Sequence, residues 1–125
     1  MGTKHRPAYA ASSATPARKA ALELVRHVRE HEVYLSSVAE TLLEPYTLDP
    51  SDKAFARLIA QGAISLQTTL DTLIDRSLRS PRDIKPNVRD ALRISAYEIV
   101  YLRKEDHAAV DQGVELVRYL APRAT

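Results

Sequence analysis

A chain of 125 residues is the size of one domain, and with 45% hydrophobic residues it can bury a substantial core. It contains no cysteine, which excludes disulfides, thiolate metal ligands and a cysteine nucleophile. No apolar run approaches the ~20 residues that a membrane-spanning helix needs, and the N-terminus has no apolar signal-peptide core, so we expect a cytoplasmic protein.

The net charge of +2 is small, but the basic residues are concentrated at the front of the chain. Residues 1–31 carry two acidic side chains against six basic ones, which are Lys4, Arg6, Arg18, Lys19, Arg26 and Arg29. This asymmetry points to an anionic partner such as nucleic acid, although a solvated surface has the same pattern. Residues 1–15 have too few large apolar side chains to order themselves, so we interpret them as a flexible basic arm.

The first predicted helix covers residues 17–31. Thr15 is a suitable N-cap and Pro16 a favourable first helical residue. One side of this helix is apolar and is expected to pack inward. The adjacent arc holds Arg18, Lys19, Arg26 and Arg29 and is expected to face outward, although Leu22 interrupts it.

A shorter helix is predicted over residues 35–43, followed by one long central helix over residues 52–78 with Asp49 as its N-cap. Steps of three and four define an apolar stripe along the long helix, made of Phe55, Leu58, Ile59, Gly62, Leu66, Leu70, Leu73, Ile74 and Leu78. Because this apolar stripe is stable only when it is buried, the flanking segments are expected to pack around it.

Two prolines, Pro81 and Pro86, end the long helix and introduce further helices over residues 87–102 and 105–120. No segment alternates apolar and polar residues as a half-buried strand does, so the predicted fold class is all-α. Gly62 and Gly113 are expected to allow close approach of helices. Tyr97 and Tyr101 lie one turn apart and could stack on bases, but packing of their rings is the interpretation that we favour.

Four short motifs follow one another along the chain: Asp52 to Arg57 with Gly62, Leu70-Asp71, Leu92-Arg93-Ile94 with Ala96-Tyr97-Glu98, and His107 to Asp111 with Val114-Glu115-Leu116. In this order and spacing they resemble the NusB family, which comprises the antitermination factor NusB and the N-terminal domain of RsmB-type rRNA cytosine-5 methyltransferases. The similarity extends over residues 17–120.

The resemblance implies that residues 16–125 form a NusB-like RNA-binding domain, a bundle of about five to six helices around the long central helix. The NusB proteins of this family bind the boxA element of rRNA leaders together with the ribosomal protein NusE, in a transcription complex. In the family, a basic N-terminus and first helix contact the RNA. At matching positions these are Arg18 and Lys19, with Arg26 and Arg29 further along the arc and Lys4 and Arg6 in the arm.

The chain departs from the family pattern in two ways. The sequence stops before the family's last helix, so we expect either a fragment of a longer protein or a domain without this helix. Absence of the helix would expose apolar surface on the preceding helices to a second copy or another partner. The late motif reads Asp111-Gln112 where the family usually has Asn-Glu, and the N-terminus is poorer in arginine.

Other chemistry has less support. His27 to His31 fits the H-x-x-E-H pattern of some zinc peptidases, but a third ligand and an open cleft are lacking, so we interpret both histidines as surface residues. There is no P-loop and no G-x-S-x-G, and we expect neither catalysis nor a cofactor. Two alternatives remain open: an RNA-recognition domain of an rRNA cytosine-5 methyltransferase, and a helical adaptor that does not bind RNA.

Overall fold

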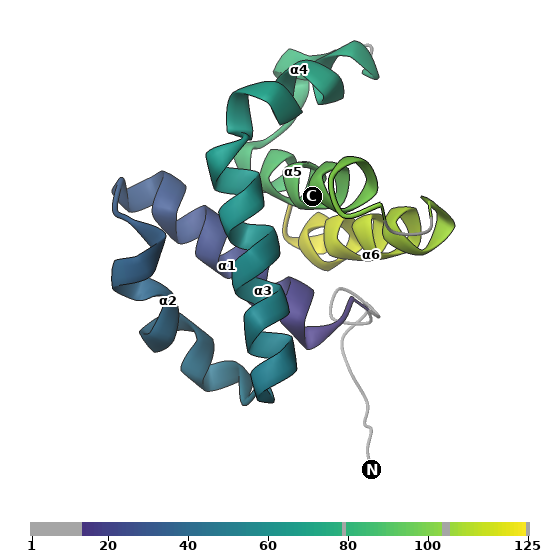
Figure 1. The fold of residues 1–125 in the computed structure, drawn as a ribbon. Coiled ribbons are helices and arrows are strands. Elements are labelled where there is room, and N and C mark those ends of the chain that lie inside the picture. The colour runs from purple at the N-terminus through teal and green to yellow at the C-terminus, as the bar shows by residue number, and fades with distance from the viewer. Residues whose placement is uncertain (1–13, 79, 104–105, 125) are drawn as a thin grey trace.

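The computed structural model describes residues 14–78, 80–103 and 106–124, with the backbone alone for 106–109 and 121–124. This part of the chain contains α-helices and short 3-10 turns and no strands, which confirms the all-α prediction (Figure 1). The elements are α1 (Pro16–His31), α2 (Leu35–Leu43), η2 (Glu44–Tyr46), α3 (Pro50–Ser65), α4 (Gln67–Arg76), η3 (Pro81–Asp83), α5 (Pro86–Val100) and α6 (Asp106–Ala124).

Helix α1 begins as predicted. The Thr15 side chain accepts a hydrogen bond from the Arg18 backbone N–H, and Pro16 occupies the first helical position. The backbone N–H of Thr15 donates to Gln112 Oε1 of α6 at 3.0 Å, and Ala14 is buried. These two residues, at the end of the predicted arm, therefore pack with the helices, while residues 1–13 lie outside the described part of the chain.

Short side chains allow α1 and α3 to cross closely, with α3 in front of α1 in Figure 1. Both contacting faces are rich in buried alanine, namely Ala17, Ala20 and Ala21 on α1 and Ala56, Ala60 and Ala63 on α3. Larger side chains fill the surrounding core, and each contributes about 1.5–3 kcal/mol by leaving water. Those fully buried include Leu24, Leu43, Ile59, Ile94 and Leu116.

The prediction of one continuous helix over residues 52–78 is wrong. The predicted cap is present, because Asp49 Oδ1 accepts from the Asp52 N–H at 2.8 Å, but the helix ends at Ser65 and α4 begins at Gln67. Leu66 lies between them with φ −107° and ψ 22°, outside the helical region. Ser65 and the β-branched Thr68 both have lower helix propensity than alanine, the residue type that recurs in α3 before the break. The break redirects α4 across α5, as Figure 1 shows.

Both glycines lie where two helices approach closely, as predicted. A Cβ atom on Gly62 of α3 would collide with the Tyr97 ring of α5, and one on Gly113 of α6 would meet the Ser95 side chain. Tyr97 is half-buried and stacks on Tyr101 with ring centroids 5.5 Å apart. The tyrosine pair is therefore engaged in packing, although Tyr101 remains 43% exposed.

Replacing Gly62 with valine is expected to lower the free energy of unfolding by about 1–3 kcal/mol, because the Tyr97 ring must leave its position against α3. Urea denaturation followed by circular dichroism measures this loss. The matched control is Ala54→Val on the exposed side of the same helix, where only the small loss of helix propensity applies. Equal losses in the two variants would contradict the close approach.

An apolar surface covers α5 between its neighbours α4 and α6. One hollow of about 340 Å³ is lined by residues that include Leu73, Leu78, Leu92, Ile99 and Val100. A second hollow of about 280 Å³, lined by Leu92, Val110, Val114 and Val117 among others, continues it over α6. Val110 and Val114 are about half exposed. The expected apolar surface on the last helices is thus present.

Candidate RNA interface

The first of the predicted RNA-binding cations, Arg18, points into the fold. Its Nε donates to Glu98 Oε2 at 2.8 Å and its Nη2 donates to Glu98 Oε1, so both arms of the guanidinium hold one carboxylate of α5. Glu98 is 1% exposed and Arg18 is 13% exposed. The Arg18 guanidinium also lies 5.2 Å from the centre of the Phe55 ring. The prediction that Arg18 faces outward is wrong, because it connects α1 to α5.

Arg29 makes a second connection between α1 and α5. Its Nε and Nη2 donate to the fully buried Asp90 at 3.0 and 2.8 Å, and Nη2 also donates to Asn87 Oδ1 at 2.9 Å. Burial raises the pKa of Asp90 above its ordinary value, although the hydrogen bonds and charge of Arg29 act against this. The hydrogen bond to Asp90 in turn raises the pKa of Arg29. The Arg29 side chain is still 26% exposed, so part of it remains accessible to solvent.

Two residues of the family motifs extend this network to α4. Arg93 of α5 donates to Asp90 at 3.2 Å and to both oxygens of Asp71 at 2.8 and 2.9 Å. Arg89 of α5 also reaches Asp71 at 3.3 Å. Burial opposes ionisation of Asp71, but hydrogen bonds and charge from Arg93 and Arg89 outweigh it and lower the pKa of Asp71 below its ordinary value of 3.8. These motif residues therefore fix the relative positions of α1, α4 and α5.

The lowered pKa of Asp71 predicts a specific acid sensitivity. Because the folded state holds the ionised form, the stabilisation is complete above about pH 4 and is lost as the pH falls through the lowered pKa. Asp71→Asn is expected to be less stable at neutral pH and to lose less stability on acidification than the unaltered protein. Urea denaturation across a pH series measures both curves. Curves that fall in parallel would contradict this assignment.

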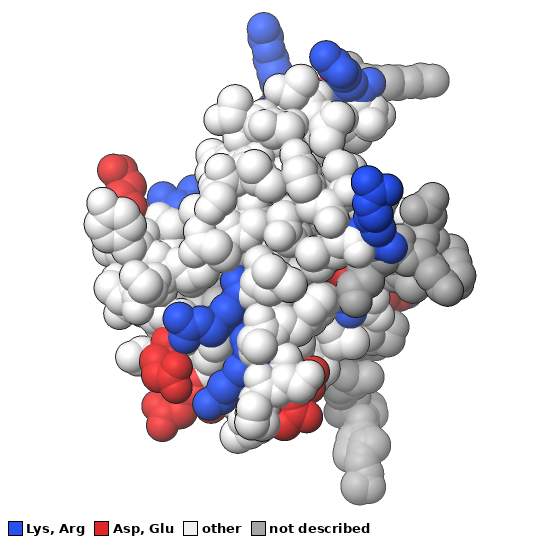
Figure 2. Space-filling model, viewed as in Figure 1, with Lys and Arg blue, Asp and Glu red and all other residues white. Residues whose placement is uncertain are grey.

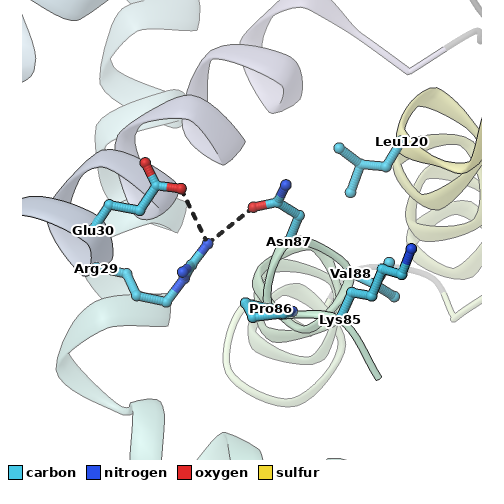
Figure 3. A pocket seen from close by; sticks show the side chains of 7 residues that line it. All are labelled: Arg29, Glu30, Lys85, Pro86, Asn87, Val88 and Leu120. Atoms are coloured by element: carbon cyan, nitrogen blue, oxygen red, sulfur yellow. Dashed lines mark hydrogen bonds and ion pairs between the residues drawn. The ribbon is translucent and has the colours of Figure 1, made fainter. Parts of the chain in front are cut away.

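The remaining cations of α1 lie along a groove between α1, the start of α5 and the end of α6, which we call the α1–α5 groove. A part of about 370 Å³ lies between Arg29 on one side and Lys85 and Val88 on the other. A narrower part of about 60 Å³ continues past Lys19 and Arg26, and the two parts share Asn87 and Leu120. Figure 3 shows Arg29 between Glu30 and Asn87, with Leu120 of α6 across the groove.

The groove combines cations with aromatic rings. Lys19 Nζ lies 4.9 Å from the centre of the Tyr119 ring, and Tyr46 lines the same part of the groove. Arg26 is 33% exposed and bridges two acidic residues of its own helix, Glu23 and Glu30. Burial raises the pKa of Tyr46 above its ordinary value. Cations beside aromatic rings and an amide form a surface that suits a single-stranded nucleic acid.

Among the cationic, amide and aromatic residues of this groove, four were not predicted from the sequence: Tyr46, Lys85, Asn87 and Tyr119. Lys85 and Asn87 flank Pro86 at the first turn of α5, a place where exposed polar groups gather, and this position was the available signal. Tyr46 and Tyr119 carried no signal, because nothing in their local sequence indicates that they meet. Lys4 and Arg6 lie outside the described residues.

The two histidines of the H-x-x-E-H pattern in α1 contact each other. The His27 and His31 rings stack with centroids 4.1 Å apart, and His31 Nδ1 lies 3.1 Å from the His27 carbonyl oxygen. In the described part of the chain, no three His, Cys, Asp or Glu side chains group as a metal site requires. No helix among the described residues is both long and apolar enough to cross a bilayer.

The NusB family model matches residues 15–124 of this chain. A putative methyltransferase of Mycobacterium tuberculosis is 36% identical over 101 residues, which is 80% of this chain and 22% of that protein. A probable ribosomal RNA small subunit methyltransferase B of Bacillus subtilis is 25% identical over 105 residues, 83% of this chain and 24% of its own length. The transcription antitermination protein NusB of Macrococcus caseolyticus is 28% identical over 110 residues, which is 85% of this chain and 82% of that protein.

The chain thus spans about a fifth to a quarter of the methyltransferases and most of the antitermination protein. No solved structure gives a significant match. The family match covers the three helices that form the groove and every motif residue from which the resemblance was drawn, so it confirms that interpretation. The chain belongs to the NusB family.

Proposed function

We propose that this chain is a NusB-type RNA-binding module that acts in rRNA transcription antitermination or rRNA maturation in the cytoplasm. The observation that carries the proposal is the α1–α5 groove, in which cations of α1 and α5 lie beside tyrosines and an amide. Family membership supports RNA binding as the general activity. In this proposal the domain itself is non-enzymatic, and its role is recognition.

In this proposal RNA phosphates contact Lys19, Arg26 and Arg29 of the groove, together with Lys4 and Arg6 of the N-terminal arm. Arg26 would exchange one of its two carboxylate partners for a phosphate, a step that needs little rearrangement because Glu23 and Glu30 are on the surface. Unstacked bases would lie against the ring of Tyr119. Arg18, which the family resemblance predicts as a direct contact, has both guanidinium arms on Glu98 and contributes by positioning α1.

The partners proposed from the family are a NusE-like ribosomal protein and the transcription complex, with a homodimer as the other possible assembly. The apolar surface over α4, α5 and α6 offers room for any of these proteins. It lies apart from the α1–α5 groove, since the two share no lining residue. Protein and RNA could therefore bind at the same time.

A second function is favoured by one comparison. The putative mycobacterial methyltransferase is more similar to the chain than the antitermination protein of Macrococcus caseolyticus, at 36% against 28% identity. The chain would then be the RNA-recognition domain of, or derived from, an rRNA cytosine-5 methyltransferase. A coding sequence that continues beyond residue 125 into a cofactor-binding domain would decide for this function.

The proposal is tested by reversing the charge of two groove cations and measuring the affinity for RNA. Lys19→Glu combined with Arg26→Glu is expected to weaken binding of a boxA-like rRNA leader by about tenfold or more. It is also expected to reduce the log–log slope of affinity against salt by about 0.7 for each phosphate that is no longer neutralised. Affinities are measured across a salt series by fluorescence anisotropy, with a scrambled RNA in parallel.

The matched control reverses the same two residue types elsewhere. Lys53→Glu with Arg57→Glu alters two surface cations of α3 that pair with Glu40 and line neither part of the groove. It is expected to retain most of the affinity. If both double variants lose affinity equally, the groove is not the binding site. If the unaltered protein binds no RNA at low salt, the adaptor alternative replaces this proposal.

A further inference from the structure

Exposed cations gather at the turn between α4 and α5, a region that the sequence marks only by its two prolines. Arg76 is the last residue of α4, Arg82 lies in η3, and Lys85 precedes α5. All three are exposed. Figure 2 shows Lys and Arg side chains projecting from the end of the molecule that Figure 1 labels α4.

Arg76 and Arg82 differ from the cations of α1 in having no acidic partner within the described residues. Every cation of α1 has an intramolecular contact: Arg18 with Glu98, Lys19 with Tyr119, Arg26 with Glu23 and Glu30, and Arg29 with Asp90. The carboxylates of α4 near the turn are also occupied, because Asp71 and Asp75 both pair with Arg89. The guanidinium groups of Arg76 and Arg82 are thus available to an external anion.

The described part of the turn, which excludes residue 79, is attached to the helices on both sides. Arg89 Nη2 donates to the Pro81 carbonyl oxygen of η3 at 3.1 Å and lies 2.9 Å from Asp75 Oδ1 of α4. Arg89 therefore ties η3 and α4 to α5 through one guanidinium. A surface that is ordered before binding loses less conformational entropy when a ligand binds.

The turn is continuous with the α1–α5 groove. Lys85 lines the wide part of the groove opposite Arg29, and Arg82, in the short η3 turn, comes shortly before Lys85 in the chain. The first turn of α5 contains no acidic residue, so the N-terminal dipole of α5 adds to the positive potential where the groove opens toward the turn.

We propose that Arg76 and Arg82 bind phosphates of the RNA strand where it leaves the α1–α5 groove past Lys85, so that the α4–α5 turn extends the RNA-binding surface. This inference rests on the proposed function, since it needs RNA in the groove. It adds a second, more peripheral set of contacts whose chemistry is phosphate neutralisation without base recognition.

The test compares RNA length and salt dependence. Arg76→Ala with Arg82→Ala is measured in the full chain against single-stranded RNAs of about 4 to about 16 nucleotides, the range of site sizes for such grooves. The variant is expected to bind the shortest RNA as the unaltered protein does, and to gain less affinity with length. For the longest RNA its log–log salt slope is expected to be smaller by about 1.4, the value for two phosphates that are no longer neutralised.

Two controls separate charge from structure. Lys53→Ala with Arg57→Ala removes two surface cations of α3 and is expected to leave the length dependence unchanged. Arg76→Lys with Arg82→Lys keeps the charge and is expected to restore the salt slope. Melting temperatures of all variants are compared to confirm folding.

The outcomes distinguish this inference from the proposed function. RNA binding with unchanged length and salt dependence in the Arg76→Ala, Arg82→Ala variant overturns the extension alone. Equal loss for the shortest and longest RNA also overturns it, because the turn would then belong to the primary site. No RNA binding by the unaltered protein overturns both.

Discussion

Replacing Arg18 with alanine is expected to lower the free energy of unfolding by about 3–5 kcal/mol, the usual cost of leaving a buried ionic group without its partner. The variant leaves the Glu98 carboxylate without its guanidinium at a site that is 1% exposed. It also removes the cation that lies against the Phe55 ring. Urea denaturation at neutral pH measures the destabilisation.

The matched control is Arg118→Ala in α6. Arg118 pairs with Glu115 at 3.0 Å but is 59% exposed, so its removal is expected to cost no more than about 1 kcal/mol. A second variant, Arg18→Met with Glu98→Leu, replaces the buried pair with apolar side chains and is expected to regain most of the stability that Arg18→Ala loses. Similar losses for Arg18→Ala and Arg118→Ala would contradict a structural role for Arg18.

Replacing Asp90 with alanine is expected to be destabilising by a similar amount, about 3–5 kcal/mol, because this carboxylate serves two cations. Arg29 of α1 and Arg93 of α5 both donate to it, and it has no exposed surface. Thermal and urea unfolding of the variant measure the effect.

The size of the loss in Asp90→Ala can be checked against two other variants. Asp90→Asn keeps one acceptor oxygen for Arg29 and is expected to fall between the alanine variant and the unaltered protein. Asp83→Ala removes an exposed carboxylate of η3 and is expected to change stability by less than about 0.5 kcal/mol. A loss in Asp90→Ala as small as that in Asp83→Ala would show that the buried network contributes nothing.

Most helix boundaries followed from local signals. In the structure Thr15 caps α1, and prolines occupy the first position of α1, α3, η3 and α5, at residues 16, 50, 81 and 86. The break at Leu66 was missed for a physical reason. Buried apolar residues continue from Ile59 to Ile74 across the break, although the predicted stripe member Leu58 is exposed. Periodicity indicates which face of a helix is buried, not whether its backbone hydrogen bonds are continuous. The break lets α4 pack on α5 through Asp71 and Arg93, a tertiary interaction that local sequence does not reveal.

The candidate site was predictable in composition but not in geometry. The basic residues of α1 were singled out from the sequence, and the structure brings Lys19, Arg26 and Arg29 to one groove. A helical projection shows which residues share a side of α1, but it cannot show that Glu98 and Asp90 lie opposite Arg18 and Arg29. Asp90 follows Arg29 by 61 positions and Glu98 follows Arg18 by 80, and these carboxylates decide which cations of α1 are held within the fold.

The connections of α1 have a consequence for how the protein is made. Thr15 is hydrogen-bonded to Gln112, 97 residues away, and Arg18 to Glu98, 80 residues away. During synthesis α1 leaves the ribosome before α5 and α6. At about 5–20 residues per second, several seconds pass between the synthesis of α1 and that of the residues of α5 and α6 that bind it. Until then Arg18 and Arg29 are solvated, and the groove has only one wall. A nascent chain therefore gains its proposed RNA-binding surface only after nearly the whole domain has emerged.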